Sequence, residues 1–349
     1  MPWGKRLVVA IAIVIFCPSC ALSLRRVVRY AQDVLKALAS GSAIRKLLQS
    51  RSPHALLMTA DDLYSRLCNE DHVSGRLIVI EVVPTGHVGA VPPIPGSQRV
   101  WRPDYQLPIS SSQPLDGLAP TAESFEAFAQ RLGVNEDSEV ILISERYDDT
   151  RLWWLFVAFG KRSVYILDGG FTEWERRVAA RPLASLEKTK GTVKHARGTW
   201  KAQPFNTQLL ATRPSVSRLR TAAKPRLWDV RTKEEYEGSV ILPGAARAGR
   251  IPWATRRVEW NMFRREDGTW LPPHEIRETA RRELDASRDD REDQNFTHVF
   301  YCQSGVRTTQ LIFGLSLAGW PLDRLKNYDG SWIEWSHVAH DDDILKEEL

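Results

Sequence analysis

After residue 57, short apolar runs alternate with segments in which apolar residues recur at helical spacing. The runs typical of buried strands are LIVIEV (77–82), VILIS (140–144), RLWDVR (226–231) and HVFYC (298–302). The helical segments are 122–133, 150–160, 273–284 and 307–320. Strands that alternate with helices predict an α/β fold of parallel sheets covered by helices on both faces. In such sheets, ligands bind at the carboxyl ends of the strands.

The same order of segments occurs twice, which indicates an internal duplication. DGGFTEW (168–174) is matched by DGSWIEW (329–335), and VILIS is matched by HVFYC at nearly the same offset. The duplication predicts two tandem domains of one fold. The predicted limits are 58–182 for the first domain, 183–212 for a polar linker, 213–340 for the second domain and 341–349 for an acidic tail.

The length of 349 residues agrees with two domains, and the composition limits the chemistry that they can hold. Hydrophobic residues make up 43% and charged residues 26% of the chain, as in globular proteins that bury a core. Two of the four cysteines lie close to the N-terminus, which excludes a disulfide scaffold and a four-cysteine zinc site. The histidines and glycines form no metal-binding or nucleotide-binding motif. We therefore predict no metal, no cofactor, and cysteine chemistry that depends on one thiol.

The net charge of +5 comes from the N-terminal segment and not from the domains. Residues 1–60 contain nine basic residues and one acidic residue, so the rest of the chain is slightly acidic. No basic stripe with interleaved aromatic residues occurs after residue 60. A slightly acidic body lacks the electrostatic surface that binds phosphate backbones, so we predict no nucleic-acid partner.

The N-terminal segment has the pattern of a targeting sequence. Lys5 and Arg6 precede an apolar run at 7–16, and small residues follow it, as in a secretory signal peptide. The uncharged stretch continues to nearly the length of a membrane span. We therefore expect residues 1–24 to be a signal peptide or membrane anchor, and the protein to be exported or anchored to a membrane through its N-terminus. Residues 25–57 are basic and rich in Ser and Ala, which makes import into a plastid or mitochondrion the alternative.

The segment HVFYCQSGVRTTQLIFGL is the strongest local signal for chemistry. A buried strand ends at Cys302, a glycine follows at 305, and a helix is expected to begin near Arg307. Backbone N–H groups of the loop can turn toward the sulfur, and the N-terminus of the helix adds positive potential. Both effects favour a thiolate, and the same arrangement would hold the terminal sulfur of a persulfide. From these residues alone, a buried structural cysteine is the alternative.

These motifs together resemble the tandem-domain rhodaneses, a sulfurtransferase family that includes thiosulfate and 3-mercaptopyruvate sulfurtransferases. The resemblance covers about residues 58–340. The matching segments are GHVGAVPPIPGSQRVWRPDYQLP, RLWW and LDGGFTEW in the first half, and LWDVRTKEEY, CQSGVR and NYDGSWIEWS in the second. The resemblance implies that the second domain is catalytic and that Cys302 accepts a sulfane sulfur from a small-molecule donor. The acceptor would be cyanide, a thiol or a partner protein.

The resemblance also implies which residues bind the donor. They are Gln303, Ser304, Gly305, Val306 and Arg307 of the loop, together with Arg231. The loop shares Ser304 and Gly305 with the CGSGVT pattern of mercaptopyruvate-type members, and it lacks the two cations of the CRKGVT pattern of thiosulfate-type members. The donor, thiosulfate or 3-mercaptopyruvate, therefore stays open.

One departure from the family pattern concerns charge. An arginine usually precedes the aromatic residue of the LWDVRTKEEY motif, and here Glu235 stands in that place. A donor carboxylate would then need another cation. The candidates are Arg231, Arg247, Arg250 and Arg307. For Arg231, a structural brace to Asp229 is the alternative.

The first repeat lacks the features that activate a thiol. Ser144 stands opposite Cys302 when the strand ends are aligned, and no glycine follows it. Acidic residues at 145, 148 and 149 would repel sulfur anions. We therefore predict that the first domain is inactive and structural.

Two other functions compete with sulfur transfer by an enzyme. Related cysteine phosphatases and arsenate reductases place five residues between the cysteine and an arginine, whereas only four residues separate Cys302 from Arg307. The shorter loop suits sulfur better than a tetrahedral oxyanion. A non-enzymatic sulfur-carrier or interaction module is the other alternative, and the intact cysteine loop argues against a purely structural role.

Overall fold

The structure, a computed structural model, describes residues 56–68, 76–84, 94–110, 113–178, 181, 195–284 and 296–346. The predicted signal peptide or anchor at 1–24, and all but the last two residues of the basic segment 25–57, lie outside these ranges. Within the described ranges, no helix has both the length and the apolar character needed to cross a bilayer.

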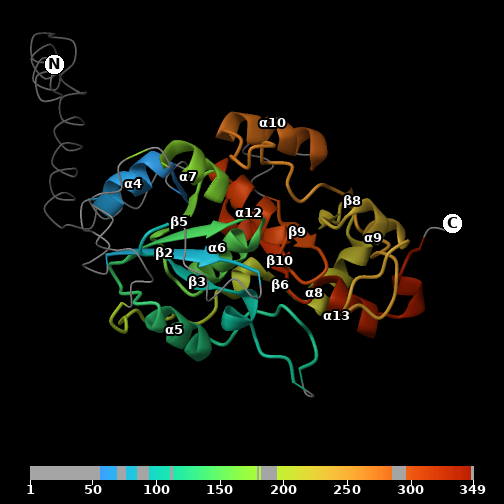
Figure 1. Ribbon diagram of the computed structural model, residues 1–349. Helices are drawn as coiled ribbons and strands as arrows, with labels where there is room; N and C mark the ends of the chain where they lie inside the picture. Colours follow the sequence, from blue (N-terminus) through green and yellow to red (C-terminus); the bar gives the residue numbers. More distant parts are fainter. Residues whose placement is uncertain are drawn as a thin grey trace, which may run out of the picture. The chain divides into compact units, whose positions relative to one another are not determined.

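The first domain is built on a five-stranded parallel sheet with the order β1-β5-β4-β2-β3 (Figure 1). Its strands are β1 (Leu57–Met58), β2 (Leu77–Val82), β3 (Gln98–Val100), β4 (Glu139–Ser144) and β5 (Val164–Leu167). Its helices are α4 (Ala60–Cys68), α5 (Ala122–Arg131), α6 (Asp148–Ala158) and α7 (Gly170–Val178). Because β2 and β4 pair in register up to Val82 and Ser144, the loops that follow them leave the sheet at one edge.

The second domain repeats this arrangement, with the strand order β6-β10-β9-β7-β8 and parallel pairing throughout. Its strands are β6 (Leu210–Ala211), β7 (Leu227–Asp229), β8 (Arg256–Arg257), β9 (His298–Tyr301) and β10 (Leu325–Tyr328). Its helices are α8 (Arg213–Arg218), α9 (Lys233–Glu237), α10 (Pro273–Glu283), α12 (Thr308–Leu317) and α13 (Ser331–Val338). The equal strand order in the two sheets confirms the predicted duplication of one α/β fold.

Both faces of the sheets are buried, because alternate residues of the central strands belong to different cores. Ile78 and Ile80 of β2 share a core with residues of α5 and α6, whereas Leu77 and Val79 share one with residues of α4 and α7. In the second sheet, Phe300 of β9 belongs to the same core as residues of α10 and α12, and its two neighbours belong to the core of α8 and α13. The prediction of helices on both faces is confirmed.

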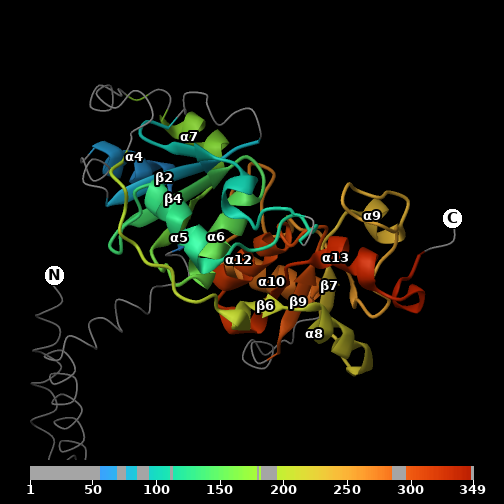
Figure 2. The same ribbon diagram turned by 90° about the horizontal axis from the view of Figure 1, so that it is seen from below.

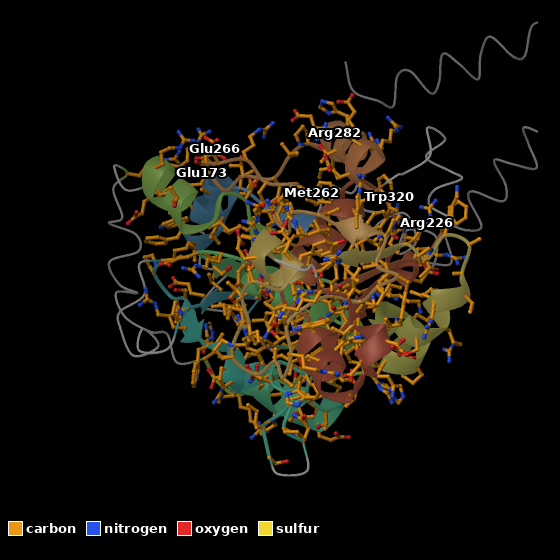
Figure 3. All side chains as sticks on the ribbon, turned by 90° about the vertical axis from the view of Figure 1, so that its right-hand side faces the viewer. Glu173, Arg226, Met262, Glu266, Arg282 and Trp320 are labelled. Carbon is orange, nitrogen blue, oxygen red and sulfur yellow. The ribbon has the colours of Figure 1, made fainter. Side chains whose placement is uncertain are left out.

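One hydrophobic core continues from the first domain into the second. α6 and α12 lie side by side in both views (Figure 1 and Figure 2). Trp153 of α6 and Phe313 of α12 meet edge to face, with ring centroids 4.8 Å apart. Trp320, labelled in Figure 3, is buried in this core, and Met262 packs against it. The two domains therefore share an apolar interface, which the strongly apolar sequences of both helices require.

The predicted linker and the predicted tail contain hydrogen-bonded backbone where they are described. Trp200, in the second half of the linker, is buried, and its N–H donates to the carbonyl of Val134 in the first domain at 3.0 Å. The strand β6 lies inside the predicted linker and pairs with β10 of the second sheet. In the tail, Leu345 forms an antiparallel bridge with Arg250. Both segments therefore pack on the domains beside them.

Candidate functional site

The loop that begins with Cys302 connects β9 to α12 at the carboxyl end of the second sheet. Cys302 is only 1% exposed. Its backbone N–H donates to the hydroxyl of Ser331 at 3.1 Å, and its carbonyl accepts from the N–H of Trp332 at 2.9 Å. Ser331 has a positive φ of 49°, which is uncommon outside glycine. The start of α13, in the repeated DGSWIEW motif, thus holds the base of the cysteine loop.

Gly305 allows the loop to turn sharply. Its φ is +69°, and a Cβ atom there would lie 2.6 Å from the carbonyl oxygen of Asp329. Its own carbonyl oxygen accepts hydrogen bonds from Thr308 Oγ1 at 2.9 Å, Asn327 Nδ2 at 2.9 Å and Arg151 Nη1 at 3.2 Å. Three donors therefore fix the orientation of this peptide group, and a side chain at position 305 would force the loop away from Asp329.

The N–H groups of the loop are available to a ligand. Those of residues 303–307 donate to no acceptor within the described part of the chain. α12 begins at Thr308, directly after them, so its N-terminal N–H groups add positive potential. A thiolate or persulfide on Cys302 is the kind of anion that such a group of amides stabilises.

Arg307 does not project into solvent. Its guanidinium donates to both carboxylate oxygens of Glu235, at 2.7 and 2.8 Å, and both residues are buried. Burial by itself would lower the pKa of Arg307, but its hydrogen bonds to Glu235 and its electrostatic attraction to Cys302 raise this pKa overall. Burial would raise the pKa of Glu235, but the hydrogen bonds from Arg307 lower it overall. The expected loop cation is therefore present beside Cys302 and is neutralised by the carboxylate that replaces the usual arginine.

Arg231 has the contacts of a structural brace. Its Nη2 donates to Asp229 Oδ2 at 2.7 Å and to the carbonyl of Gly249 at 2.8 Å, and its guanidinium stacks on the ring of Trp332 at 4.4 Å. The side chain is 1% exposed. These contacts agree with the alternative given above, in which Arg231 is a structural brace to Asp229.

The other two candidate arginines also have contacts within the second domain. Arg247 Nη1 forms an ion pair with Asp341 at 2.7 Å, and its Nε donates to the carbonyl of Ser336. The guanidinium of Arg250 lies 4.3 Å from the centroid of the Tyr236 ring. Each of the four arginines therefore contacts an acid or an aromatic ring.

The first domain contributes directly to the wall around the cysteine loop. A Cβ atom at Gly117 would lie 2.9 Å from the carbonyl oxygen of Ser304, so the two backbones are in close contact. On the other side of the loop, Gln303 Nε2 donates to the carbonyl of Pro243 at 3.1 Å. The loop is thus enclosed between a segment of the first domain and the segment after α9.

The equivalent loop of the first domain contains two side-chain-to-backbone hydrogen bonds of its own. Ser144 Oγ accepts from the N–H of Asp149 at 3.2 Å, and Asp149 Oδ1 accepts from the N–H of Thr150 at 2.8 Å. Asp149 is fully buried, and Arg264 of the second domain pairs with it at 3.3 Å. Burial raises the pKa of Asp149 despite this partner. The strand-end hydroxyl of this loop thus accepts a hydrogen bond from an N–H group in the first turn of α6.

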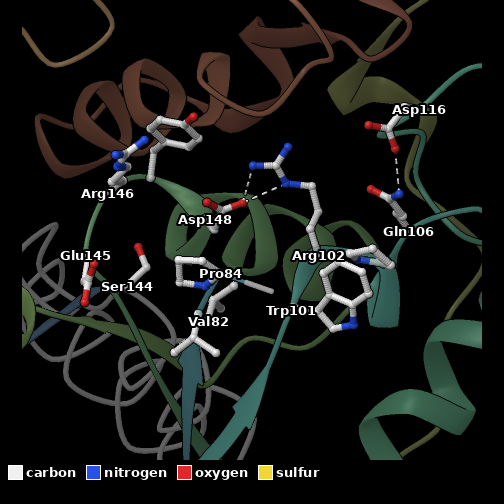
Figure 4. Close-up of a pocket in the computed structure, with 13 residues that line it drawn as sticks. Val82, Pro84, Trp101, Arg102, Gln106, Asp116, Ser144, Glu145, Arg146 and Asp148 are labelled. Atoms are coloured by element: carbon white, nitrogen blue, oxygen red, sulfur yellow. Dashed lines mark hydrogen bonds and ion pairs between the residues drawn. The ribbon is translucent and has the colours of Figure 1, made fainter. Parts of the chain in front are cut away.

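A cavity of about 500 Å³ lies beside this first loop (Figure 4). It lies next to the strand ends of β2 and β4, and its charged lining residues are Arg102, Asp116, Glu145, Arg146 and Asp148. Arg102 and Asp148 form an ion pair at 2.7 Å. Asp148 therefore has an arginine partner and does not present an isolated charge.

Several residues at the cysteine loop were absent from the sequence-based list. Gly117, Arg151, Asn327, Asp329 and Ser331 all contact the loop. Asn327 to Ser331 could have been suspected, because the DGSWIEW motif follows a strand that neighbours the one ending at Cys302. Arg151 lies in RLWW, a segment of the family resemblance that carried no predicted site residue.

Both domains match the family model described as "Rhodanese-like domain", over residues 60–177 and 212–337. The chain is 28% identical over 241 residues to 3-mercaptopyruvate sulfurtransferase of Homo sapiens, covering 68% of this chain and 75% of that protein. It is 30% identical over 272 residues to the sulfur carrier protein TtuD of Thermus thermophilus, covering 73% of this chain and 84% of that protein. The fold is similar to that of the Tum1 protein of Saccharomyces cerevisiae, with a TM-score of 0.66, 18% identity, and coverage of 84% of this chain and 98% of that one.

Proposed function

This chain belongs to the rhodanese family and is a two-domain sulfurtransferase, and from that premise we propose that Cys302 carries the transferred sulfur as a persulfide. One observation supports the assignment most strongly. Cys302 is buried at the start of a loop whose next five N–H groups have no acceptor within the described residues. These N–H groups can stabilise negative charge on the sulfur of Cys302 or on the sulfur added to it.

The reaction proceeds in two halves. With thiosulfate, the Cys302 thiolate attacks the outer sulfur, the S–S bond breaks, and sulfite leaves with the electron pair. With 3-mercaptopyruvate, the C–S bond breaks, and the carbon that keeps the electron pair takes a proton as pyruvate leaves. In the second half, a nucleophilic acceptor takes the outer sulfur and the Cys302 thiolate returns.

The loop residues have different parts in this proposal. The backbone N–H groups of Gln303, Ser304, Gly305 and Val306 hold the transferred sulfur, because their side chains are small or engaged elsewhere. Arg307 supplies positive charge near Cys302, and Glu235 limits its net effect. Arg231 stabilises the framework beneath the loop through Asp229.

Both donors remain in the proposal. The human relative is named a 3-mercaptopyruvate sulfurtransferase, which supports that donor. For the acceptor, cyanide and small thiols are nucleophiles that can take the outer sulfur of a persulfide, and the Thermus relative is named a sulfur carrier protein, which supports transfer to a partner protein. A protein acceptor is the second candidate function for that reason.

The experiment loads the purified protein with each donor and follows the sulfur. Mass spectrometry should show one added sulfur atom on the peptide that contains Cys302, and cyanide should release it as thiocyanate. Cys302→Ala should abolish both the added sulfur and the turnover. Cys68→Ala is the matched control, because Cys68 is the other cysteine among the described residues. Turnover that survives in Cys302→Ala, or a sulfur found on Cys68, would show that the nucleophile is wrongly assigned.

A further inference from the structure

We propose that Arg151 of the first domain is a positioning residue for the Cys302 loop of the second domain. Sulfur transfer then requires the first domain for the shape of the site, although its own loop holds no thiol. The proposal rests on the proposed role of Cys302 and adds to it a residue that had no role among the sequence-based predictions.

Arg151 is buried between the domains, with 1% of its surface exposed. Its Nη1 donates to Asp329 Oδ1 at 2.6 Å and to the carbonyl of Gly305 at 3.2 Å. Its Nη2 donates to the carbonyl of Gly117 at 2.7 Å. The guanidinium also lies 4.9 Å from the ring centroid of Trp154. One planar group thus joins the middle of the cysteine loop to the first-domain segment that touches Ser304.

Asp329 completes this connection from the second domain. Its Oδ2 accepts from the backbone N–H of Ala119 at 2.7 Å, so both of its carboxylate oxygens bind the first domain. The backbone of Asp329 is also the surface against which Gly305 packs. Arg151 and Asp329 therefore hold the Gly117 segment, the Gly305 turn and the start of α13 in one arrangement.

The geometry of the peptide group explains how this arrangement reaches the sulfur. In a trans peptide the carbonyl and the following N–H point in opposite directions. Arg151, Thr308 and Asn327 all bind the carbonyl of Gly305, so the N–H of Val306 is directed away from them. Loss of the donor from Arg151 would let this peptide group rotate and would weaken the group of N–H donors around the sulfur.

A second buried ion pair between the domains provides a matched control. Arg264 of the second domain binds Asp149 at 3.3 Å and stacks on Trp270 at 4.3 Å. It also binds Gln310, which lies in α12 beyond the cysteine loop. Arg264 has 11% of its side chain exposed against 1% for Arg151, and it also joins the domains, but no contact connects it to residues 302–307 in the described part of the chain.

The experiment compares Arg151→Met, combined with Asp329→Asn so that no buried carboxylate is left without a partner, with Arg264→Met combined with Asp149→Asn. For each full-length variant we measure the thermal midpoint, kcat/KM for thiocyanate formation, and the pH profile of Cys302 alkylation by iodoacetamide, read by mass spectrometry. The Arg151 double variant should lose about 10-fold to 100-fold in kcat/KM, as expected when a reactive group is misplaced by a fraction of an ångström to an ångström. Its alkylation profile should move to higher pH.

The Arg264 double variant should lower the thermal midpoint by a similar amount but keep kcat/KM and the alkylation profile within about twofold of the parent. Arg151→Lys provides a conservative test if the double variant does not fold. A lysine can still pair with Asp329 but cannot reach both carbonyls with a planar fork, so an intermediate alkylation profile is expected.

An unchanged alkylation profile in a folded Arg151 variant would overturn the proposal and leave Arg151 a purely structural residue. An equal change in the Arg264 control would also overturn it, because the effect would then come from loosening the interface. Alkylation does not depend on sulfur transfer. A parent protein that reacts normally with iodoacetamide but forms no persulfide would therefore contradict the proposed function and leave the role of Arg151 in the loop intact.

Discussion

At the end of its central strand, the first domain carries Ser144 and the second carries Cys302, and the loops that follow differ in one backbone hydrogen bond and in charge. In the first loop, Ser144 accepts the N–H of Asp149, and Asp149 accepts the N–H of Thr150. In the second loop, the N–H groups of residues 303–307 have no acceptor among the described residues. The two loops therefore differ at the fifth residue after the strand end, where the N–H of Asp149 is bound to Ser144 and the N–H of Arg307 has no acceptor among the described residues.

The two loops also differ in the charge at matching positions. When the strand ends are aligned, Asp149 of the first loop stands opposite Arg307 of the second. Each has a partner of opposite charge, Arg264 for Asp149 and Glu235 for Arg307. Only the pair of Arg307 and Glu235 lies beside Cys302. The same kind of charge pair is therefore structural in the first domain, whereas in the second domain it can change the charge near the cysteine.

The largest effect is expected from closing the second loop. Gly305 stands opposite Tyr147 when the two repeats are aligned. Gly305 has a left-handed backbone conformation, and Gly305→Ala would place a Cβ atom 2.6 Å from the carbonyl oxygen of Asp329. We expect kcat/KM to fall by about 100-fold, because the loop must move away from Asp329. Gly319→Ala is the control, since Gly319 also has a positive φ but has no atom within 4 Å of its Cβ position. Thiocyanate assays should show near-normal activity for Gly319→Ala, and equal losses in the two variants would mean that backbone strain alone is responsible.

A smaller effect is expected from releasing the charge of Arg307. Glu235→Gln keeps the shape of the partner but removes its negative charge, so the cation beside Cys302 is no longer neutralised. We expect kcat/KM with thiosulfate, a dianion, to rise by about tenfold, which corresponds to about 1.4 kcal/mol of added attraction. The rise should be smaller with 3-mercaptopyruvate. Equal kinetics in parent and variant with both donors would remove Arg307 from donor binding.

Glu235 and Asp149 should make contributions to the free energy of unfolding that change with pH in opposite directions. The folded-state pKa of Glu235 is lowered, so its contribution to the free energy of unfolding is fully present above the unfolded pKa of about 4.3 and is lost as pH falls through the folded value. The folded-state pKa of Asp149 is raised by burial, so protonation is easier in the folded state and the cost of its buried charge is relieved as pH falls.

Urea unfolding measured from neutral to acidic pH tests this contrast. The difference in unfolding free energy between the parent and Glu235→Gln should shrink as pH falls, whereas the difference between the parent and Asp149→Asn should shift in favour of the parent. The steepest slope for one proton is about 1.4 kcal/mol per pH unit. Slopes of the same sign for both variants would contradict the assigned directions.

The smallest effect is expected at Ser144. Ser144→Ala removes one acceptor for the N–H of Asp149 but touches no reacting group, so kcat/KM should stay within about threefold of the parent. Ser144→Cys should acquire no cyanide-releasable sulfur, because the loop after it has no glycine for a sharp turn and carries acidic residues at 145, 148 and 149. A persulfide on residue 144 in that variant would show that the first loop can also stabilise a sulfur anion, which would contradict the distinction between the two domains.

Local patterns predicted much of the architecture. LIVIEV coincides with β2, the segment at 122–133 contains α5, and the segment at 273–284 contains α10. These elements have either a clear helical periodicity of apolar residues or a continuous apolar run. Such patterns indicate one buried face of a helix or a strand that is buried on both faces of a sheet. The place of Cys302 at a strand end followed by a turn was readable for the same reason.

Contacts between segments far apart in the chain could not be predicted from the sequence. Sequence spacing does not say which carboxylate will meet Arg307, because Glu235 reaches it from α9 in a different part of the chain. In the same way, RLWW predicts a buried helix, but only the packing of α6 on α12 brings Arg151 to the carbonyl of Gly305.

By itself, the sequence determined the duplicated α/β fold, the position of one cysteine at a strand end of the second repeat and the absence of a matching thiol in the first repeat, because these depend on residue type and local period. Only the tertiary structure decided that the Arg307 charge is neutralised by Glu235 and that Arg151 of the first domain contacts the cysteine loop of the second. The physical reason is that a buried charge takes whichever partner the packing of the helices and sheets brings within hydrogen-bond distance.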